Sequence, residues 1–493
     1  MESRPEPLFT AAQVRELDRI AIEEHGMAAT ELMERAGRAV YQAMCSRWPR
    51  VRHIAVFCGA GNNAGDGYVL ARLARAGGLT VQVVAVYDPA GLKGAAREAW
   101  ARAVAEGVPI EPLSGLHMER AELLVDALLG TGLQRPLEGV YREVVERMNG
   151  CGAPILAVDV PSGLDADTGA VLGAAVEAEA TLTFIGRKIG LYTGEGPACA
   201  GQVLFDDLGV PAEVLARVPP AAGLLDDRGL AALLPRRRRT AHKGAFGHVL
   251  VVGGDEGMAG AARLAAEAAA RAGAGLVSLA TRAAQVPAII AGRPEIMARG
   301  VESVADLAPL LARATVVAIG PGLGRTAWGR GMWQAVRGTG LPLVVDADAL
   351  DLLAESGLPD GTERVLTPHP GEAARLLERT AAEIQADRPV AARSLQQRFG
   401  GVAVLKGAGT LVAGPDSLAV CSLGNPGMAS GGMGDVLTGI LAGLWAQGFD
   451  ALTAAALAVQ VHAAAADAAA AAGGERGLLA SDLFPFLRTQ LNP

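Results

Sequence analysis

A glycine-rich loop near the C-terminus, over residues 425–435, carries the strongest chemical signal of this 493-residue sequence. It reads Asn-Pro-Gly-Met-Ala-Ser-Gly-Gly-Met-Gly-Asp and leads into a helical pattern over residues 435–446. Glycines leave backbone N–H groups free to converge on a phosphate at a helix N-terminus. Asp435, in the first turn of that helix, is placed to take a proton from an attacking hydroxyl. The loop therefore predicts nucleotide-dependent chemistry at a hydroxyl, although no P-loop of the form GxxxxGK[ST] occurs.

Four other strand-end segments of the C-terminal half fit the same site. The first offers backbone, ammonium and hydroxyl donors to a nucleotide through Lys406, Gly407, Ala408, Gly409 and Thr410. The loop over residues 367–372 holds His369 between two prolines, where we favour contact with a substrate over a purely structural role. The acids over residues 346–348 either bind a nucleotide's divalent ion or cap a helix. The loop over residues 320–324 reads Gly-Pro-Gly-Leu-Gly.

A second glycine-rich turn, over residues 59–67, follows a strand pattern and opens a helix in the N-terminal half. Its glycines match a Rossmann fingerprint loosely, with Asp88 after the next strand as a partner for a ribose hydroxyl. A dehydrogenase loop has no need of Asn62, Asn63 and Asp66, whose oxygens favour a small cation and ribose hydroxyls. The structural alternative is a polar turn with a helix cap.

Two more acids end buried strand patterns in this half. Asp126 begins the segment Asp-Ala-Leu-Leu-Gly-Thr-Gly, and Asp159 begins Asp-Val-Pro-Ser-Gly. Ligands of open parallel sheets bind outside the carboxyl ends of the strands, so these segments and the 59–67 turn should border one crevice. Each acid is a candidate acid–base group, and each can instead cap its own loop.

Strand and helix patterns alternate through both halves, which predicts two α/β domains with parallel sheets covered by helices on both faces. We expect strands in two series, at residues 53–58, 80–87, 122–126, 155–160, 180–185 and 202–205, and then at 248–253, 276–281, 316–319, 343–345, 364–366 and 402–405. A hairpin should follow over residues 410–421, and Thr10 with Gln13 predicts a capping box. Two prolines and the run Arg236–Arg239 indicate a solvated linker. The expected domains are residues 1–215 and 240–493, with a linker over 216–239.

The composition suits a cytoplasmic protein without nucleic-acid or membrane partners. Hydrophobic residues make up 51% of the chain, and the net charge of −8 gives no basic footprint for nucleic acid or anionic lipid. The five cysteines are scattered without metal-ligand spacing, and no signal-peptide pattern is present, so we expect a reduced compartment. The apolar stretch over residues 454–472 is interrupted by Gln460, His462 and Asp467, which predicts a buried or amphipathic helix.

Four ordered motifs of the N-terminal half resemble the NAD(P)H-hydrate epimerase family: residues 30–37, 61–67, 126–132 and 159–163. The resemblance implies a Rossmann-like three-layer αβα fold and epimerisation at the hydrated ring carbon, with Asp159 as acid or base. It implies that Asn63, Asp126 and Ser162 supply oxygens to K⁺. Lys188 is either a helper or a surface lysine. The hydrate would contact Asn62, Asn63, Ala64, Gly65, Asp66, Gly130, Thr131, Gly132, Leu133, Gln134, Arg135, Pro136 and Asp159. The family loop usually has glycine where this chain has Ala64.

Eight ordered motifs over most of residues 240–492 resemble the ADP-dependent NAD(P)H-hydrate dehydratase family, which has a ribokinase-like fold. They lie at residues 242–244, 247–254, 260–262, 320–324, 346–348, 367–372, 406–410 and 425–435. The resemblance implies that residues 406–410 and Gly434 bind the adenine nucleotide. Ala261, Gly322, His369 and Asp435 would bind the hydrate. Phosphoryl transfer to the ring hydroxyl, with Asp435 as base, would precede elimination of phosphate.

The implied substrates are NADHX, NADPHX and ADP, with Mg²⁺, and ATP is an alternative nucleotide. The main rival is a ribokinase-type small-molecule kinase fused to a non-catalytic ligand-binding domain. A plain dehydrogenase and a purely regulatory N-terminal half are further alternatives. Because apolar, Ala-rich surfaces favour self-association, we also expect a homo-oligomer.

Overall fold

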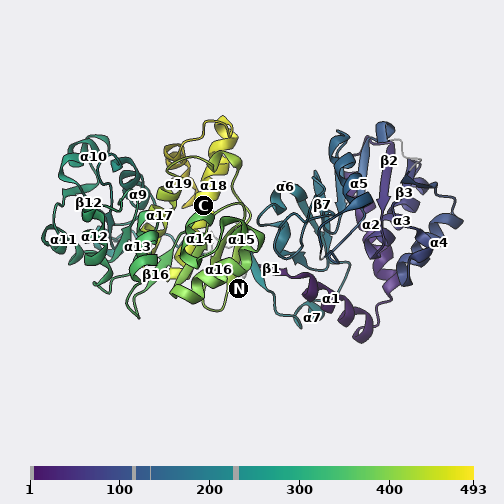
Figure 1. The fold of residues 1–493 in the computed structure, drawn as a ribbon, viewed down its shortest axis with the longest axis horizontal. Helices are drawn as coiled ribbons and strands as arrows, with labels where there is room; N and C mark the ends of the chain where they lie inside the picture. Colours follow the sequence, from purple (N-terminus) through teal and green to yellow (C-terminus); the bar gives the residue numbers. More distant parts are fainter. Residues whose placement is uncertain (1–4, 114–117, 134, 226–232, 493) are drawn as a thin grey trace. The chain divides into compact units, whose positions relative to one another are not determined.

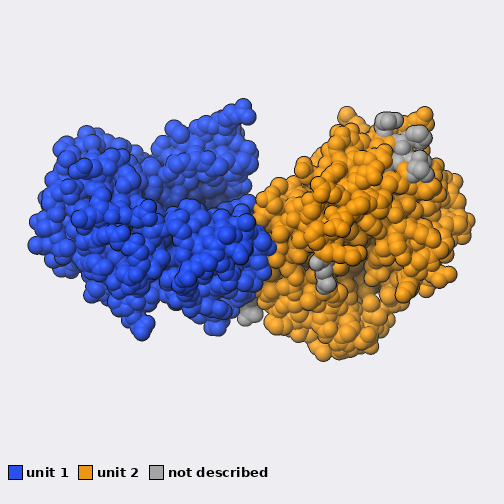
Figure 2. All heavy atoms as spheres, viewed as in Figure 1, with its two compact units in different colours: residues 1–6, 223–493 blue, residues 7–222 orange. Residues whose placement is uncertain are grey.

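The structure, a computed structural model, describes residues 5–113, 118–133, 135–225 and 233–492 (Figure 1). The chain forms two compact units (Figure 2). The N-terminal unit spans Pro7–Ala222, and the C-terminal unit comprises Gly223–Pro493 with the first six residues. Both units are α/β, as the alternating patterns predict.

The N-terminal unit contains a seven-stranded sheet in the order β4-β3-β2-β5-β6-β7-β9. All of its pairings are parallel. The strands are β2 (His53–Cys58), β3 (Thr80–Ala85), β4 (Ile110–Pro112), β5 (Leu123–Ala127), β6 (Ile155–Val158), β7 (Ala180–Phe184) and β9 (Gln202–Asp206). The strand order reverses between β2 and β5, and such a switch point leaves a crevice at the carboxyl ends of the two strands.

Helices cover both faces of this sheet. Ile54, Val56 and Cys58 pack with α2 (Ala29–Arg47), α3 (Asn62–Ala76) and α4 (Gly94–Ala105) in one core cluster. The intervening residues Ala55 and Phe57 pack with α5 (Gly139–Gly150) in another. Because successive strand side chains point to opposite faces, the two clusters make a three-layer αβα unit.

The first helix, α1 (Ala11–Arg19), brings a segment distant in sequence to the sheet. Thr10 and Gln13 form the predicted capping box, and Ala11, Val14 and Leu17 are buried. A short π-helix (Ile20–Glu24) follows. Before α1, strand β1 (Glu6–Phe9) pairs in parallel with β8 (Arg187–Lys188). This pairing ties α1 to the loop that follows β7.

The sheet of the C-terminal unit runs in the order β13-β12-β11-β14-β15-β16-β17-β18-β19-β10. Its strands are β10 (Ala222–Leu225), β11 (His248–Val252), β12 (Leu276–Thr281), β13 (Met297–Gly300), β14 (Val316–Ile319), β15 (Leu343–Val345), β16 (Arg364–Leu366), β17 (Val402–Leu405), β18 (Thr410–Ala413) and β19 (Leu418–Cys421). Pairing is parallel from β13 to β17. Strands β18 and β19 form the predicted hairpin, and β18 also pairs antiparallel with β17. The order reverses between β11 and β14.

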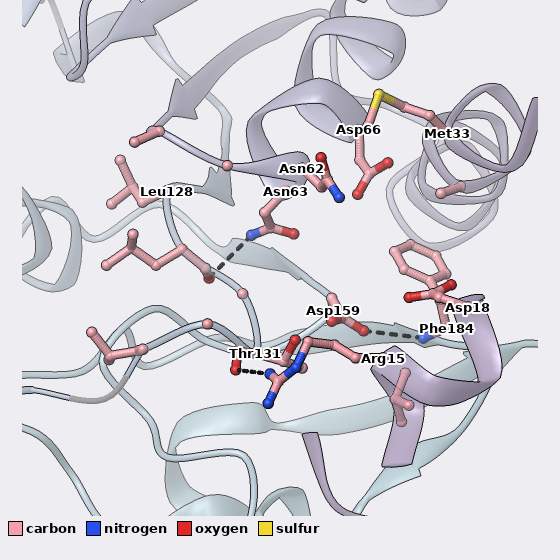
Figure 3. A pocket seen from close by; sticks show the side chains of 18 of the residues that line it. Arg15, Asp18, Met33, Asn62, Asn63, Asp66, Leu128, Thr131, Asp159 and Phe184 are labelled. Atoms are coloured by element: carbon pink, nitrogen blue, oxygen red, sulfur yellow. Dashed lines mark hydrogen bonds between the residues drawn. The ribbon is translucent and has the colours of Figure 1, made fainter. Parts of the chain in front are cut away.

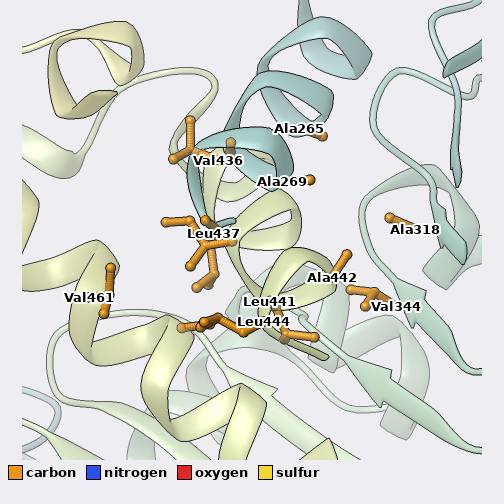
Figure 4. Packing of buried hydrophobic residues seen from close by; sticks show 14 of the residues in the cluster. Ala265, Ala269, Ala318, Val344, Val436, Leu437, Leu441, Ala442, Leu444 and Val461 are labelled. Atoms are coloured by element: carbon orange, nitrogen blue, oxygen red, sulfur yellow. The ribbon is translucent and has the colours of Figure 1, made fainter. Parts of the chain in front are cut away.

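Three helices dominate the C-terminal core: α9 (Ala259–Arg271), α17 (Met433–Trp445) and α18 (Ala451–Gly473). Figure 4 shows Leu437 and Leu441 of α17 among buried residues of α9, α18 and two strands. Helix α18 is long and apolar enough to cross a membrane, but 67% of its most apolar window is buried inside the unit. It is a core helix, in agreement with the prediction of a buried or amphipathic helix for this stretch.

The structure differs from the expectations mainly at element ends and at short edge strands. Helix α3 begins at Asn62 rather than at residue 66, and α17 begins at Met433 rather than at Asp435. The short strands β1, β4, β8, β10 and β13 had no clear apolar run to reveal them.

Within the predicted linker 216–239, Ala222–Leu225 forms β10, which pairs in parallel with β19, and residues 226–232 lie outside the described ones. Arg237 in the same segment donates to the Gly273 carbonyl (2.6 Å) and lies over the Phe246 ring, so this arginine contacts the unit although it stays exposed.

Candidate active sites

A cavity of about 1520 Å³ opens at the switch point of the N-terminal sheet (Figure 3). Its walls come from α1, from the first turn of α3, from the loop after β5, and from the segments after β6 and β7. Asp126 and Asp159 therefore lie near one crevice, as the strand-end argument predicts.

Asp159 and Lys188 form a buried ion pair at one side of this cavity. Lys188 Nζ lies 2.5 Å from Asp159 Oδ1 and also donates to Thr183 Oγ1 and the Phe184 carbonyl, each at 3.0 Å. The Lys188 side chain is only 1% exposed, so its interpretation as a surface lysine is wrong. Asp159 adopts a left-handed backbone (φ 66°), which is strained for a non-glycine residue and typical of functional sites.

Two further carboxyl groups face this pair. Desolvation raises the pKa of Asp18 to about 6, although Lys188 opposes the shift and Asp159 adds to it. Burial first, and then the charges of Asp159 and Asp18, raise the pKa of Asp66 well above its usual range. Figure 3 shows Asp18, Asp66 and Asp159 around a common space. The motifs pointed to Asp66 and Asp159 but not to Asp18, because a single acid on an amphipathic helix carries no motif.

A cluster of oxygens lies beside the cavity, around the Leu129 carbonyl. Ser162 Oγ donates to Asp126 Oδ1 (2.6 Å) and lies 3.1 Å from that carbonyl, to which Asn63 Nδ2 also donates (3.1 Å). Asn63 Oδ1 is buried without a hydrogen-bond partner among the described residues. Burial raises the pKa of Asp126 to about 6, against the opposing effect of its bonds from Ser162 and Leu128. An orphaned amide oxygen next to a carbonyl, a hydroxyl and a carboxylate fits a weakly hydrated cation.

Most of the remaining predicted residues of this half line the cavity: Asn62, Asn63, Asp66, Gly130, Thr131, Gly132, Leu133, Arg135, Pro136 and Asp159. Gln134 lies outside the described residues. Ala64 and Gly65 are buried and do not line the cavity, because the helix starts at Asn62 and turns them inward. A side chain at residue 65 would collide with Met33, and Ala64 belongs to the core. Arg15, which sequence reasoning did not select, also lines the cavity and donates to the Thr131 carbonyl.

In the C-terminal unit, the glycine-rich loop ends at the first turn of α17, as predicted. Gly432 has a left-handed backbone (φ 92°), and a Cβ there would meet Leu264 at 2.7 Å. Desolvation, and then the charge of Asp346, raise the pKa of Asp435 to about 7 although Lys406 opposes the shift. A carboxyl group with that pKa can exchange a proton near neutral pH.

An ammonium and several acids surround this turn. Lys406 Nζ donates to Asp346 Oδ1 (2.8 Å) and lies 3.8 Å from Glu372, while Thr438 Oγ1 donates to Asp346 Oδ2 (2.8 Å). The Lys406 ammonium thus contacts acids in this structure, and its role toward a nucleotide phosphate stays a prediction. Burial would lower the pKa of Lys406, but the charges of Asp346 and Glu372 raise it overall.

His369 stands exposed at the start of α14 (Pro370–Leu377). Its Nδ1 accepts from the Gly371 N–H (3.0 Å), and its Nε2 lies 3.3 Å from Glu372 Oε1. Partial burial and then the charge of Lys406 lower the pKa of His369, so the ring is mainly neutral at pH 7. The residue caps a helix and still presents its ring outward, so the structural and functional interpretations are compatible.

The loops at the switch point of this sheet lie next to the acids. The Asp255 N–H donates to the Gly322 carbonyl (2.7 Å), and the Gly324 N–H donates to Asp348 Oδ2 (2.9 Å). A Cβ on Gly322 would lie 3.3 Å from the Ala261 Cβ at the start of α9. The predicted residues Ala261 and Gly322 are therefore neighbours, and Asp348 connects their loop to the carboxylates around Asp435.

Two buried basic groups near this site were not predicted. Arg388 lies behind the loop after β17, where its guanidinium faces the carbonyls of Leu405, Lys406 and Gly409 at 3.3 to 3.5 Å. Burial lowers the pKa of His462 in α18 to about 4, and its Nε2 has no partner among the described residues. Neither residue stands in a glycine-rich motif, so nothing in the local sequence marked them.

Comparison with known proteins decides the family. Residues 249–488 match the family model of NAD(P)H-hydrate dehydratase, and residues 29–190 match that of the YjeF-related protein N-terminus. A bifunctional NAD(P)H-hydrate repair enzyme from Coxiella burnetii is 50% identical over 99% of both chains. One from Escherichia coli K12 is 46% identical over 100% of this chain and 95% of that one. This chain belongs to the family of bifunctional NAD(P)H-hydrate repair enzymes.

The fold of the dehydratase half of this repair-enzyme family also has a solved relative. A ribokinase-like superfamily protein from Enterococcus faecalis V583 is 28% identical, with a TM-score of 0.52 over 55% of this chain and 98% of that one. The predicted resemblance to the repair enzymes is thus confirmed, and so is the ribokinase-like fold. The individual residue roles that the resemblance implies stay predictions.

Proposed function

We propose that this chain repairs hydrated nicotinamide cofactors at its two sites. The N-terminal unit interconverts the R and S hydrates of NADH and NADPH. The C-terminal unit dehydrates the S form with ADP, giving NAD(P)H, AMP and phosphate. The observation that carries the proposal is the end-to-end match to repair enzymes, in a chain whose two halves each hold perturbed carboxyl groups at a switch point.

In the N-terminal unit, the cavity receives the hydrated dinucleotide. The first turn of α3 and the loop after β5 bind it, with N–H groups available to its phosphates. The Asp159–Lys188 pair supplies the acid–base chemistry at the hydrated ring carbon.

In the C-terminal unit, residues 406–410 and Gly434 bind ADP, and Ala261, Gly322 and His369 bind the hydrate. Asp435 takes the proton of the ring hydroxyl as that oxygen accepts the terminal phosphoryl group and AMP leaves. Phosphate then leaves with the carbon–oxygen bonding electrons, and loss of a ring proton restores the carbon–carbon double bond.

Potassium is the cation we propose for the oxygens of Asn63, Asp126 and Ser162, because the orphaned Asn63 Oδ1 needs an electropositive partner. It would organise the loop after β5. Among the described residues, no group of three or more His, Cys, Asp or Glu side chains is arranged to hold a metal ion, and the Asp346 oxygens accept hydrogen bonds from Lys406 and Thr438. Mg²⁺ would therefore arrive with the nucleotide, where it neutralises phosphate charge. We propose ADP as the nucleotide, with ATP as the alternative.

We further propose cytoplasmic repair by a homo-oligomer, with the small molecules NADHX, NADPHX and ADP as ligands and neither nucleic acid nor membrane as a partner. The basis is the acidic composition, the free cysteines and the Ala-rich sequence. The rival, a small-molecule kinase fused to a non-catalytic domain, shares the ribokinase-like fold. It leaves unexplained the epimerase motifs and the buried Asp159–Lys188 pair.

The experiment is recovery of reduced-nicotinamide absorbance after the protein is mixed with both NADH hydrate epimers, Mg²⁺ and ADP. We expect nucleotide-dependent recovery of all the NADH. Rapid recovery of only the directly usable epimer would reduce the N-terminal unit to a binding module. No recovery with ADP or ATP would favour the kinase alternative.

A further inference from the structure

Asp18 is a cavity-lining acid that no motif marks. It lies on α1 in register with Val14 and Ile22, which line the same cavity at spacings of four residues. It is half-buried, and Figure 3 shows its carboxyl group beside Phe184, directed into the space between Asp66 and Asp159. A helix from the start of the chain thus completes a site built otherwise from strand ends.

Inversion of a ring carbon that carries a hydroxyl needs help in breaking the carbon–oxygen bond. Hydroxide is a poor leaving group at neutral pH, so a proton donor must reach the departing oxygen. Asp159 is engaged with the Lys188 ammonium and Thr183. A second carboxyl group beside that pair, Asp18, is available as the donor.

We propose that Asp18 is the catalytic acid of the epimerisation, a role that rests on the function proposed above. The ring nitrogen lone pair forms a carbon–nitrogen double bond as the carbon–oxygen bond breaks, and the hydroxyl takes the Asp18 proton and leaves as water. Water then adds to the opposite face of the ring, the Asp159–Lys188 pair takes its extra proton, and that proton passes through solvent back to the Asp18 carboxylate. No atom or electron is gained or lost, and only the configuration changes.

Asp18 suits this step better than Asp66. Asp66 is 9% exposed in the first turn of α3, and burial raises its pKa well above the usual range, whereas Asp18 is half-buried and lines the cavity. Burial raises the pKa of Asp18 only to about 6, so this group can both give and regain a proton under physiological conditions.

Several neighbouring elements place charged groups around Asp18. Arg15 shares α1, Asp66 stands on α3, Asp159 follows β6, and Lys188 ends β8. Farther along the cavity lie Lys93, Arg135, Glu138, Tyr87 and Tyr141. The lining contains no histidine among the described residues, and desolvation raises the pKa of Asp18 to about 6.

The test is the rate of epimer interconversion in the full-length protein, followed by chromatography of purified R and S hydrates from pH 5 to 8.5. For Asp18→Asn we expect kcat to fall by at least about 100-fold, with KM changed little, since general acid catalysis contributes roughly that factor or more. Wild-type activity should fall as pH rises past the pKa of Asp18, and this fall with pH should be absent in Asp18→Asn. Asp18→Glu should restore part of kcat and the fall in activity with rising pH.

A matched control is Glu16→Gln, which removes a carboxylate from the exposed face of the same helix, outside the cavity lining. It should keep wild-type kcat. Wild-type kcat in Asp18→Asn would overturn the proposal. A loss of kcat that Asp18→Glu does not relieve would also overturn it, if the fall in activity with rising pH persists in Asp18→Asn. A fall in activity with pH that disappears only in Asp66→Asn would overturn it as well. An inactive wild type would instead refute the proposed epimerase function, so the two failures are distinguishable.

Discussion

Each site contains a carboxyl group whose surroundings raise its pKa toward neutrality. Desolvation is the largest cause for Asp18 and Asp435, and neighbouring acids add to it. In each site one ammonium, Lys188 or Lys406, opposes the shift and limits its size. Each carboxyl group can therefore change its charge within the pH range in which the protein works.

Asp435→Asn should abolish nucleotide-dependent dehydration and leave epimerisation intact. A base acts in its ionised form, so wild-type dehydration should rise with pH through about 7, the pKa of Asp435. The raised pKa also means that ionised Asp435 destabilises the folded state above that pH. Asp435→Asn should thus melt at a higher temperature than the wild type at pH 8. Loss of both activities in a folded variant would contradict the assignment of the two reactions to separate units.

Lys188→Met should abolish epimerisation and destabilise the N-terminal unit. It leaves Asp159 without its ammonium partner, and breaking a buried pair from one side costs roughly 3–5 kcal/mol. The double variant Asp159→Asn with Lys188→Met should recover much of that stability in urea unfolding, but no activity. A single Lys188→Met variant with wild-type stability would show that the pair is not a buried one.

At the scale of elements, the position of Asp435 depends on how closely α17 packs against α9. A Cβ on Gly439 would lie 2.1 Å from the Ala265 carbonyl oxygen, and one on Gly443 would lie 2.6 Å from that of Ala269. Small residues on both helices allow this contact, and Figure 4 shows Ala265 and Ala269 facing the turns of α17. Helix α17 carries the nucleotide loop at its start, so its packing sets the geometry of the site.

Gly439→Ala should separate these helices and lower both stability and dehydration. Overpacking a core typically costs 1–3 kcal/mol, and here the obstacle is backbone, which cannot rotate away. Gly338→Ala at the end of α12 (Ala327–Arg337) is the control, because its Cβ would meet only the Gln334 carbonyl at 3.9 Å. The free energy of unfolding from urea titrations compares the two. Equal stability would contradict the close contact.

At the scale of the whole molecule, each unit has its own core and its own site. All residues that line the epimerase cavity belong to the N-terminal unit, and the acids around Asp435 belong to the C-terminal unit. Neither proposed reaction draws a residue from the other unit. The product of one site can therefore reach the other through solution.

A mixture of Lys188→Met and Asp435→Asn proteins should recover all NADH from both hydrate epimers with ADP and Mg²⁺. Lys188→Met alone should recover rapidly only the directly usable epimer, and Asp435→Asn alone should recover none. Absorbance of the reduced nicotinamide follows all three reactions. A mixture that performs no better than Lys188→Met would show that both sites must share one chain.

The local sequence determined the elements and the motif loops of this protein. Strands buried on both faces are continuous apolar runs, so β2, β12, β14, β15, β16 and β17 were predicted with the bounds that the structure has. The capping box of Thr10 and Gln13 depends on residues three apart and was equally predictable. The glycine-rich turns were visible because a ligand-binding loop needs residues that permit close backbone approach.

Only the tertiary structure decided which groups meet and how they ionise. Lys188 pairs with Asp159 across 29 residues of sequence, and the charges of both act on Asp18 of helix α1. The helix start at Asn62 turned Ala64 and Gly65 away from the cavity and left Asn63 Oδ1 without a partner. Burial and long-range neighbours set the charge of a carboxyl group, and neither is encoded in the residues beside it. The sequence alone therefore determined the family and its loops, and folding determined the acid–base chemistry.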